Sequence, residues 1–144
     1  GRMELTGRIF PLAHVVTPNV SELGILAQIE VDPEDDDYIG MMADAWLDFG
    51  FPNLLVTGLV RDKCMVDRLF HKDKGNNLVF DDFSHEKHSL GEVHGTGCVL
   101  SSAITAFIAK GEKLEDAVKN ASEYVSNVIA KARRIGKGAL FWEE

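Results

Sequence analysis

The stretch Asn53-Leu54-Leu55-Val56-Thr57-Gly58 decides the fold class, because it is a short apolar run that ends at a glycine. Such a run is typical of a strand buried on both faces. A second short run of β-branched apolar residues lies upstream at 13–17, and helical patterns separate the two. Because a helix joins the two strands, parallel pairing is favoured, which indicates an α/β layer protein.

Working outward from these strands, the pattern predicts the order β-α-α-β-β-β-α-α. The second helix follows an acidic run, whose carboxylates favour the positive end of the helix dipole. One stripe of that helix carries Ile39, Met42, Trp46 and Phe49. The expected helices are 19–29, 34–49, 99–109 and 113–134, and the further strands are 63–70 and 78–83, with a turn at 71–77.

The composition fits one globular domain over residues 1–144. The chain is 45% hydrophobic and 26% charged, which is ordinary for a folded domain. Its 15 Lys+Arg against 23 Asp+Glu give a formal net charge of -8, which disfavours nucleic acid or an anionic membrane as the partner. Apolar runs stay well below the ~20 residues of a membrane span. Two cysteines, Cys64 and Cys98, are too few for a disulfide framework, so a cytoplasmic location is expected.

The stretch His94-Gly95-Thr96-Gly97-Cys98 stands directly before an apolar helical run and is the strongest candidate for chemistry. Its glycines allow a tight turn that gathers backbone N–H groups, and the helix start adds unpaired N–H groups and a positive dipole end. The loop is therefore suited to an anion, and Cys98 lies where a thiolate base or nucleophile is stabilised. On pattern alone, a helix entry capped by Thr96 with a small buried Cys98 explains these residues equally well.

The stretch Thr17-Pro18-Asn19-Val20-Ser21-Glu22 is a second candidate and follows the first strand. Asn19 as the N-cap, with Glu22 three residues later, is a close relative of the capping box. The same stretch lies at the carboxyl end of a parallel strand, where open α/β sheets bind ligands. Glu22 is therefore also a candidate for a metal-phosphate site, and the capping role can hold alongside it.

Four motifs follow one another along nearly the whole chain. They are the T-P-N-x-x-E segment at 17–22, the strand Leu55-Val56-Thr57-Gly58, the hairpin Met65-Val66-Asp67-Arg68-Leu69, and His94–Cys98 with the helix after it. In this order they resemble the C-terminal half of the ribokinase-like vitamin kinases. The similarity is closest to the hydroxymethylpyrimidine/phosphomethylpyrimidine kinases of thiamine biosynthesis, which commonly have Lys-Gly-Gly where this chain has Thr57-Gly58-Leu59.

The resemblance implies a partial ribokinase-like domain, with a mostly parallel central sheet, a β-hairpin and helices on both faces. The whole chain would be the C-terminal, nucleotide-binding half of such a kinase. The implied reaction moves the γ-phosphoryl group of ATP, with magnesium, to the hydroxyl of a small hydroxymethyl substrate, and then to the resulting monophosphate.

Site roles also follow from the resemblance. Cys98 would be the catalytic base that removes the hydroxymethyl proton, and the glycine-rich loop before it would stabilise charge on the transferring group. The implied anion hole is Gly95, Thr96 and Gly97, the implied nucleotide contacts are Thr57, Gly58 and Asn19, and Glu22 would hold magnesium through water.

Two alternative functions stay open at this point. A pyridoxal/pyridoxine kinase of the same superfamily is the nearest enzyme rival, because a Gly-Thr-Gly-Cys sequence occurs there too. A non-catalytic domain that binds a nucleotide or phosphate belongs to a different class, and the missing substrate half favours it. An uncovered sheet edge should seek a partner, so we expect a homo-oligomer or a separate N-terminal half.

Overall fold

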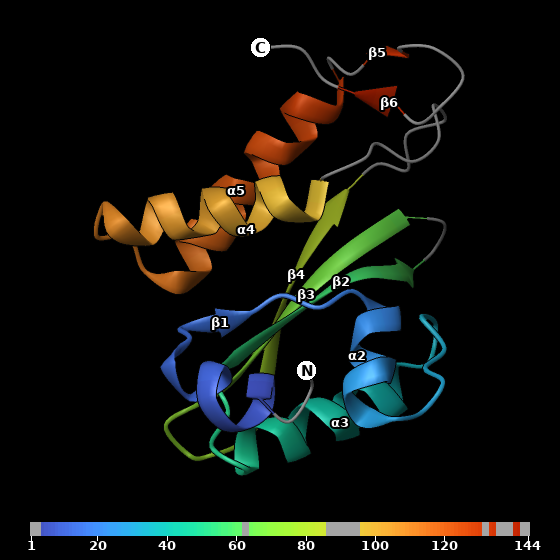
Figure 1. The fold of residues 1–144 in the computed structure, drawn as a ribbon, viewed down its shortest axis with the longest axis vertical. Coiled ribbons are helices and arrows are strands. Elements are labelled where there is room, and N and C mark those ends of the chain that lie inside the picture. The colour runs from blue at the N-terminus through green and yellow to red at the C-terminus, as the bar shows by residue number, and fades with distance from the viewer. Residues whose placement is uncertain (1–3, 62–63, 86–95, 131–132, 135–139, 142–144) are drawn as a thin grey trace. The chain divides into compact units, whose positions relative to one another are not determined.

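The computed structural model describes residues 4–61, 64–85, 96–130, 133–134 and 140–141 (Figure 1). The chain divides into two compact units, residues 1–85 and 86–144. The single domain expected from the sequence therefore stays a prediction. Among the described residues, no helix is long and apolar enough to cross a membrane.

The first unit is built on a four-stranded sheet with the order β1-β2-β3-β4. β1 (Val15–Val16) pairs in parallel with β2 (Asn53–Arg61), as the helices between them predicted. β3 (Cys64–Lys72) and β4 (Leu78–His85) continue the sheet in antiparallel fashion. The expected mostly parallel sheet is wrong for the described strands, because the short connections after β2 and β3 leave room only for hairpins. The expected β-hairpin is confirmed.

The two α-helices of the first unit begin at side-chain caps. The segment before β1 forms η1 (Leu5–Ile9) and η2 (Phe10–Leu12), which the sequence pattern did not predict. α2 (Val20–Ala27) and α3 (Asp36–Asp48) lie within the expected ranges. In α3 the side chain of Asp35 accepts a hydrogen bond from the Tyr38 N–H, which satisfies one of the free donors of the first turn. α2 and α3 contact β2, and helices on both sheet faces stay a prediction.

An aromatic cluster closes one side of the first unit's core. The rings of Phe10 and Trp46 lie 5.2 Å apart, and those of Trp46 and Phe51 lie 4.8 Å apart. The indole Nε1 of Trp46 donates to the carbonyl of Pro52 at 2.7 Å, so its polar atom is satisfied in a buried position. Ile39 on the same helix is fully buried.

Phe49 corrects the expected helical stripe. Its side chain is 80% exposed, whereas Ile39 and Trp46 are buried and Met42 is partly buried. Phe49 is the C-cap residue of α3 and its backbone is still in the helical region (φ -70°, ψ -3°), so its ring is exposed because the buried part of the stripe ends at Trp46, before the end of the helix.

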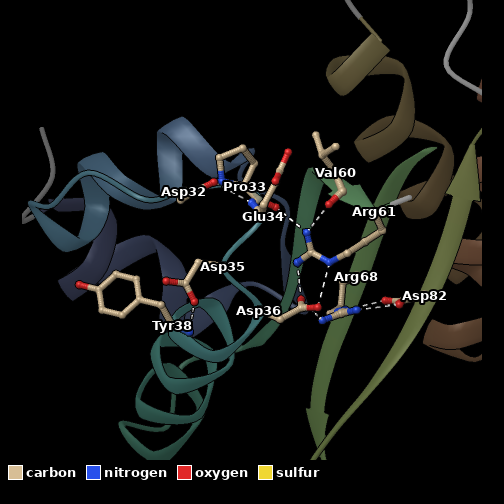
Figure 2. A network of polar contacts seen from close by, with 10 residues as sticks. All are labelled: Asp32, Pro33, Glu34, Asp35, Asp36, Tyr38, Val60, Arg61, Arg68 and Asp82. Atoms are coloured by element: carbon tan, nitrogen blue, oxygen red, sulfur yellow. Dashed lines mark hydrogen bonds and ion pairs between the residues drawn. The ribbon is translucent and has the colours of Figure 1, made fainter. Parts of the chain in front are cut away.

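A charge network ties the start of α3 to three strands (Figure 2). Asp36 in the first turn bonds Arg61 of β2 and Arg68 of β3. Arg68 also donates to both carboxylate oxygens of Asp82 in β4, at 2.6 and 2.8 Å, and its guanidinium lies 4.1 Å from the centre of the Phe80 ring. The Arg68 side chain is only 8% exposed, so its charge is paired where it is shielded from water.

Substitution of Asp36 gives a pH-dependent prediction. The hydrogen bond from Arg61 holds the pKa of Asp36 below its ordinary value of 3.8, so the unfolded state takes up the proton first as the pH falls. The carboxylate's stabilisation is therefore complete above about pH 5 and is lost as the pH drops through the folded-state pKa. We expect Asp36→Asn to lower the free energy of unfolding at neutral pH, and the difference from the wild type to vanish in acid.

Urea unfolding at several pH values measures this difference. Asp37→Asn, at the next position of the same first turn, is the matched control for the helix dipole. An Asp36→Asn deficit that equals that of the control at every pH would contradict the role of the network.

The second unit contains a helical pair and a short two-stranded sheet. α4 (Thr96–Ala109) starts three residues before the expected position, and it packs against α5 (Leu114–Ala130). The expected extension of the last helix to Arg134 is wrong, because Arg133–Arg134 form β5 and pair with β6 (Leu140–Phe141). The buried residues of the two helices are Leu100, Ile104, Ala117, Val118, Ala121, Ser122 and Val125.

Candidate functional site

The T-P-N segment lies beside the middle of β2, at Thr57. The Thr57 N–H donates to the carbonyl of Pro18 at 2.9 Å, and Asn19 and Thr57 form an isolated parallel bridge. The parallel pairing of β1 with β2 thus continues past the end of β1 into the start of α2. As a result, the predicted nucleotide residues Asn19, Thr57 and Gly58 are brought together in the first unit.

A capping box fixes the start of α2. The Asn19 side chain accepts from the Glu22 N–H at 2.8 Å, and the Glu22 carboxylate accepts from the Asn19 N–H at 2.9 Å. Both residues are exposed. The interpretation of this motif as a capping box is confirmed, and the Glu22 carboxylate lies at the N-terminus of α2.

Magnesium fits this position only through water. No group of three or more His, Cys, Asp or Glu side chains that could hold a metal occurs among the described residues. Mg²⁺ keeps several waters and is commonly held by one or two carboxylates together with substrate phosphates. The single exposed carboxylate of Glu22 is compatible with that mode, in which water rather than a protein cage completes the shell.

A β-bulge interrupts the middle of β2 at Thr57 and Gly58. The pairing register shifts between Val56 and Leu59, and Gly58 has φ +76°, a conformation that side chains rarely adopt. The Gly58 N–H donates to the carboxylate of Asp67 at 3.0 Å. Sequence reasoning noted Asp67 only as part of a motif. A glycine inside a strand pattern is the signal that could have revealed the bulge.

The second unit carries the other predicted site residues in the first turn of α4. Thr96, Gly97 and Cys98 begin this helix, while His94 and Gly95 lie outside the described residues. Cys98 is an exposed free thiol, so the interpretation of it as a small buried residue is wrong. The first-turn N–H groups of a helix have no intrahelical partner and favour an anion.

A groove of about 550 Å³ begins at Cys98 and runs along α4. Its walls are mostly apolar, and one residue of α5 contributes to them. The lining residues are Cys98, Val99, Ser102, Ala103, Ala106, Phe107, Lys110 and Tyr124.

These features are those of a phosphate-binding α/β protein. The chain is an α/β protein with a capped helix start at the carboxyl end of a parallel strand and a second helix start after a glycine-rich stretch. Both positions are of the kind that binds phosphate groups in α/β folds.

This chain belongs to the phosphomethylpyrimidine kinase family, whose model matches residues 2–142. It is 31% identical over 138 residues to the hydroxymethylpyrimidine/phosphomethylpyrimidine kinase of Haemophilus influenzae. That match covers 93% of this chain and 49% of the relative, so the chain spans about half the length of that curated protein. The resemblance to a kinase half is thereby confirmed.

Solved structures support the same ribokinase-like fold. The ADP complex of Bacillus subtilis pyridoxal kinase has a TM-score of 0.83 and 25% identity, over 99% of this chain and 52% of that one. The Staphylococcus aureus pyridoxal kinase in complex with AMP-PCP and pyridoxal has a TM-score of 0.83 and 23% identity, over 98% of this chain and 51% of that one. Those proteins bind a nucleotide, and the second also binds pyridoxal.

Proposed function

We propose that this chain is the C-terminal, nucleotide-binding half of a kinase that phosphorylates hydroxymethylpyrimidine and its monophosphate in thiamine biosynthesis in the cytoplasm. The observation that carries the proposal is the family match over residues 2–142, which includes every candidate site residue. The bridge between Asn19 and Thr57 supports it further, because it joins two of the three nucleotide candidates.

In the proposed reaction, this chain's own residues bind the nucleotide and move one proton. Asn19, Thr57 and Gly58 contact ATP. The Cys98 thiolate takes the proton of the substrate hydroxyl, the oxygen forms a bond to the γ-phosphorus, and the bond to the β-phosphate oxygen breaks to leave ADP.

Charge on the transferring group is stabilised by the start of α4. Gly95, Thr96 and Gly97 supply backbone N–H groups to it, in a position reinforced by the helix dipole. Magnesium, held through water by Glu22, would neutralise phosphate charge when bound.

Pyridoxal/pyridoxine phosphorylation is the second candidate function. The fold match to pyridoxal kinases, with a TM-score of 0.83, favours it. The Thr57-Gly58 sequence also suits a pyridoxal kinase better than a pyrimidine kinase, because pyrimidine kinases commonly have Lys-Gly-Gly at this position. A non-catalytic domain that binds a nucleotide or phosphate is the third candidate, and the assay below distinguishes it from the two kinases.

The free edge of β1 leads us to expect association. Among the described strands, β1 lies at one end of the sheet and pairs only with β2. An open strand edge is a template for another strand, supplied by an N-terminal half or by a second copy. We expect size-exclusion chromatography of the chain alone to show a dimer or larger species. A clean monomer at high concentration would count against self-pairing.

ATP-dependent phosphorylation of hydroxymethylpyrimidine and of pyridoxal tests the function directly. Both substrates are assayed with this chain and with a version extended upstream by the gene's own sequence, where the gene encodes one. Turnover of hydroxymethylpyrimidine supports the proposal, and turnover of pyridoxal alone supports the second candidate. Inactivity of every version, with nucleotide still bound, would favour the binding domain.

A further inference from the structure

The bulge at Gly58 is held from the neighbouring strand by a buried carboxylate. Asp67 in β3 faces the bulge, and its Oδ1 accepts the Gly58 N–H at 3.0 Å. Asp67 is only 8% exposed, between the buried residues Val66 and Arg68. A carboxylate is costly to bury, so its position calls for partners that compensate the loss of water.

The bulge leaves Gly58 in a conformation that needs such support. With φ +76°, it lies at the break in the ladder between β2 and β3, where the register shifts from Val56–Arg68 to Leu59–Val66, and its N–H bonds the Asp67 side chain. Without the Asp67 carboxylate, this donor would lose the acceptor that the structure gives it, and the extra residue of the bulge would lose a fixed position.

The other side of the bulge faces the candidate nucleotide residues. The Thr57 N–H donates to Pro18 at 2.9 Å, and Thr57 bridges Asn19. The segment Thr57-Gly58 is therefore bonded to Asp67 on the β3 side and to the T-P-N segment on the β1 side. A displacement of Gly58 would move Thr57 and so change the distance between Thr57 and Asn19.

We propose that Asp67 is a positioning residue for the nucleotide site: by accepting the Gly58 N–H it fixes the bulge that presents Thr57 and Gly58 to the nucleotide. This inference rests on the proposed function. Asp67 itself does not touch the nucleotide, and it acts through the backbone of Gly58.

The test compares ADP affinity in four forms of the full chain, by isothermal titration at a temperature where each is folded. Asp67→Ala removes the acceptor, and we expect its affinity for ADP to fall about tenfold or more. Asp67→Asn keeps an acceptor oxygen and should restore the affinity to within about threefold of the wild type. Val66→Ala is the matched control, since it removes a buried neighbouring side chain but leaves the Asp67 bond intact.

Hydrogen exchange of the Gly58 amide gives a second readout that does not depend on ADP. Faster exchange in Asp67→Ala, but not in Val66→Ala, together with the affinity pattern above, supports the proposal. Wild-type affinity in Asp67→Ala, or an equal loss in Val66→Ala, overturns it while leaving the proposed function standing. If the wild-type chain does not bind ADP, the proposed function fails, and unchanged Gly58 exchange in Asp67→Ala would then overturn the positioning role separately.

Discussion

Replacing Cys98 with Ala is expected to lower phosphoryl transfer by roughly 10²–10⁴-fold, the usual contribution of a positioned general base. Cys98 is exposed in the first turn of α4, so its sulfur is accessible to a substrate hydroxyl. Since the proposed base takes a proton only as the hydroxyl attacks, kcat should fall while the affinity for ADP stays unchanged. Steady-state kinetics and ADP titration, on whichever of the assayed versions turns over fastest, measure the two effects.

The chain offers a matched control for this experiment. Cys64 is also an exposed free cysteine, and it lies at the start of β3, in the first unit. Cys64→Ala should therefore leave kcat within about twofold of the wild type, because surface substitutions change little. Cys98→Asp, which supplies a carboxylate base at the same position, should recover part of the lost rate. Full turnover in Cys98→Ala would show that the assigned base is wrong.

Replacing Trp46 with Ala is expected to cost about 3–5 kcal/mol of unfolding free energy, the usual range for a large buried aromatic. Trp46 packs against Phe10 and Phe51 and donates to the carbonyl of Pro52. The substitution removes this packing and leaves the Pro52 carbonyl without that donor. Urea unfolding, followed by circular dichroism, measures the change.

Phe49→Ala is the control for the aromatic cluster. Phe49 is an aromatic residue of the same helical stripe, but its side chain is 80% exposed. Its removal should change the free energy of unfolding by no more than about 0.5 kcal/mol. Equal losses for Trp46→Ala and Phe49→Ala would contradict the burial pattern of α3, and Trp46→Phe should lie between the two because it keeps most of the packing.

The parallel strand pair and the helices between its strands were predictable, because the signals are local. The apolar run at 53–58 overlaps β2, and the β-branched run at 13–17 contains β1. Asn19 and Glu22 at capping-box spacing also predicted the start of α2. For β1, β2 and α2, the residues that predict where the element begins or ends lie within the element or next to it.

Errors arose where tertiary contacts decide the outcome. The stripe of α3 predicted Phe49 in the core, but the buried part of the stripe ends at Trp46, before the end of the helix. The last helix ends early because Arg133–Arg134 pair with Leu140–Phe141, a contact that periodicity does not encode. The mostly parallel sheet was inferred from the family as a whole, whereas the short hairpin connections make the described part mostly antiparallel.

The candidate site was predictable in part. The family resemblance grouped Asn19, Thr57 and Gly58 as nucleotide contacts, and the structure brings Asn19 and Thr57 together. The supporting contact from Asp67 was not predicted, because it depends on the register shift at Gly58 between two strands. The proposed anion-hole and base roles of Thr96, Gly97 and Cys98 rest on the family resemblance. The sequence pattern alone is explained equally well by the start of a helix.

The central claim is that this chain carries the nucleotide-binding half of a kinase, and an ADP titration followed by amide NMR tests it most directly. The account predicts saturable shifts of the Asn19, Thr57 and Gly58 amides, together with those of Thr96 and Gly97 at the start of α4. The exposed turn amides of Gly75 and Asn76 should stay unshifted, which provides an internal control. No saturable shift at millimolar ADP, or shifts confined to residues outside these three segments, would contradict the claim.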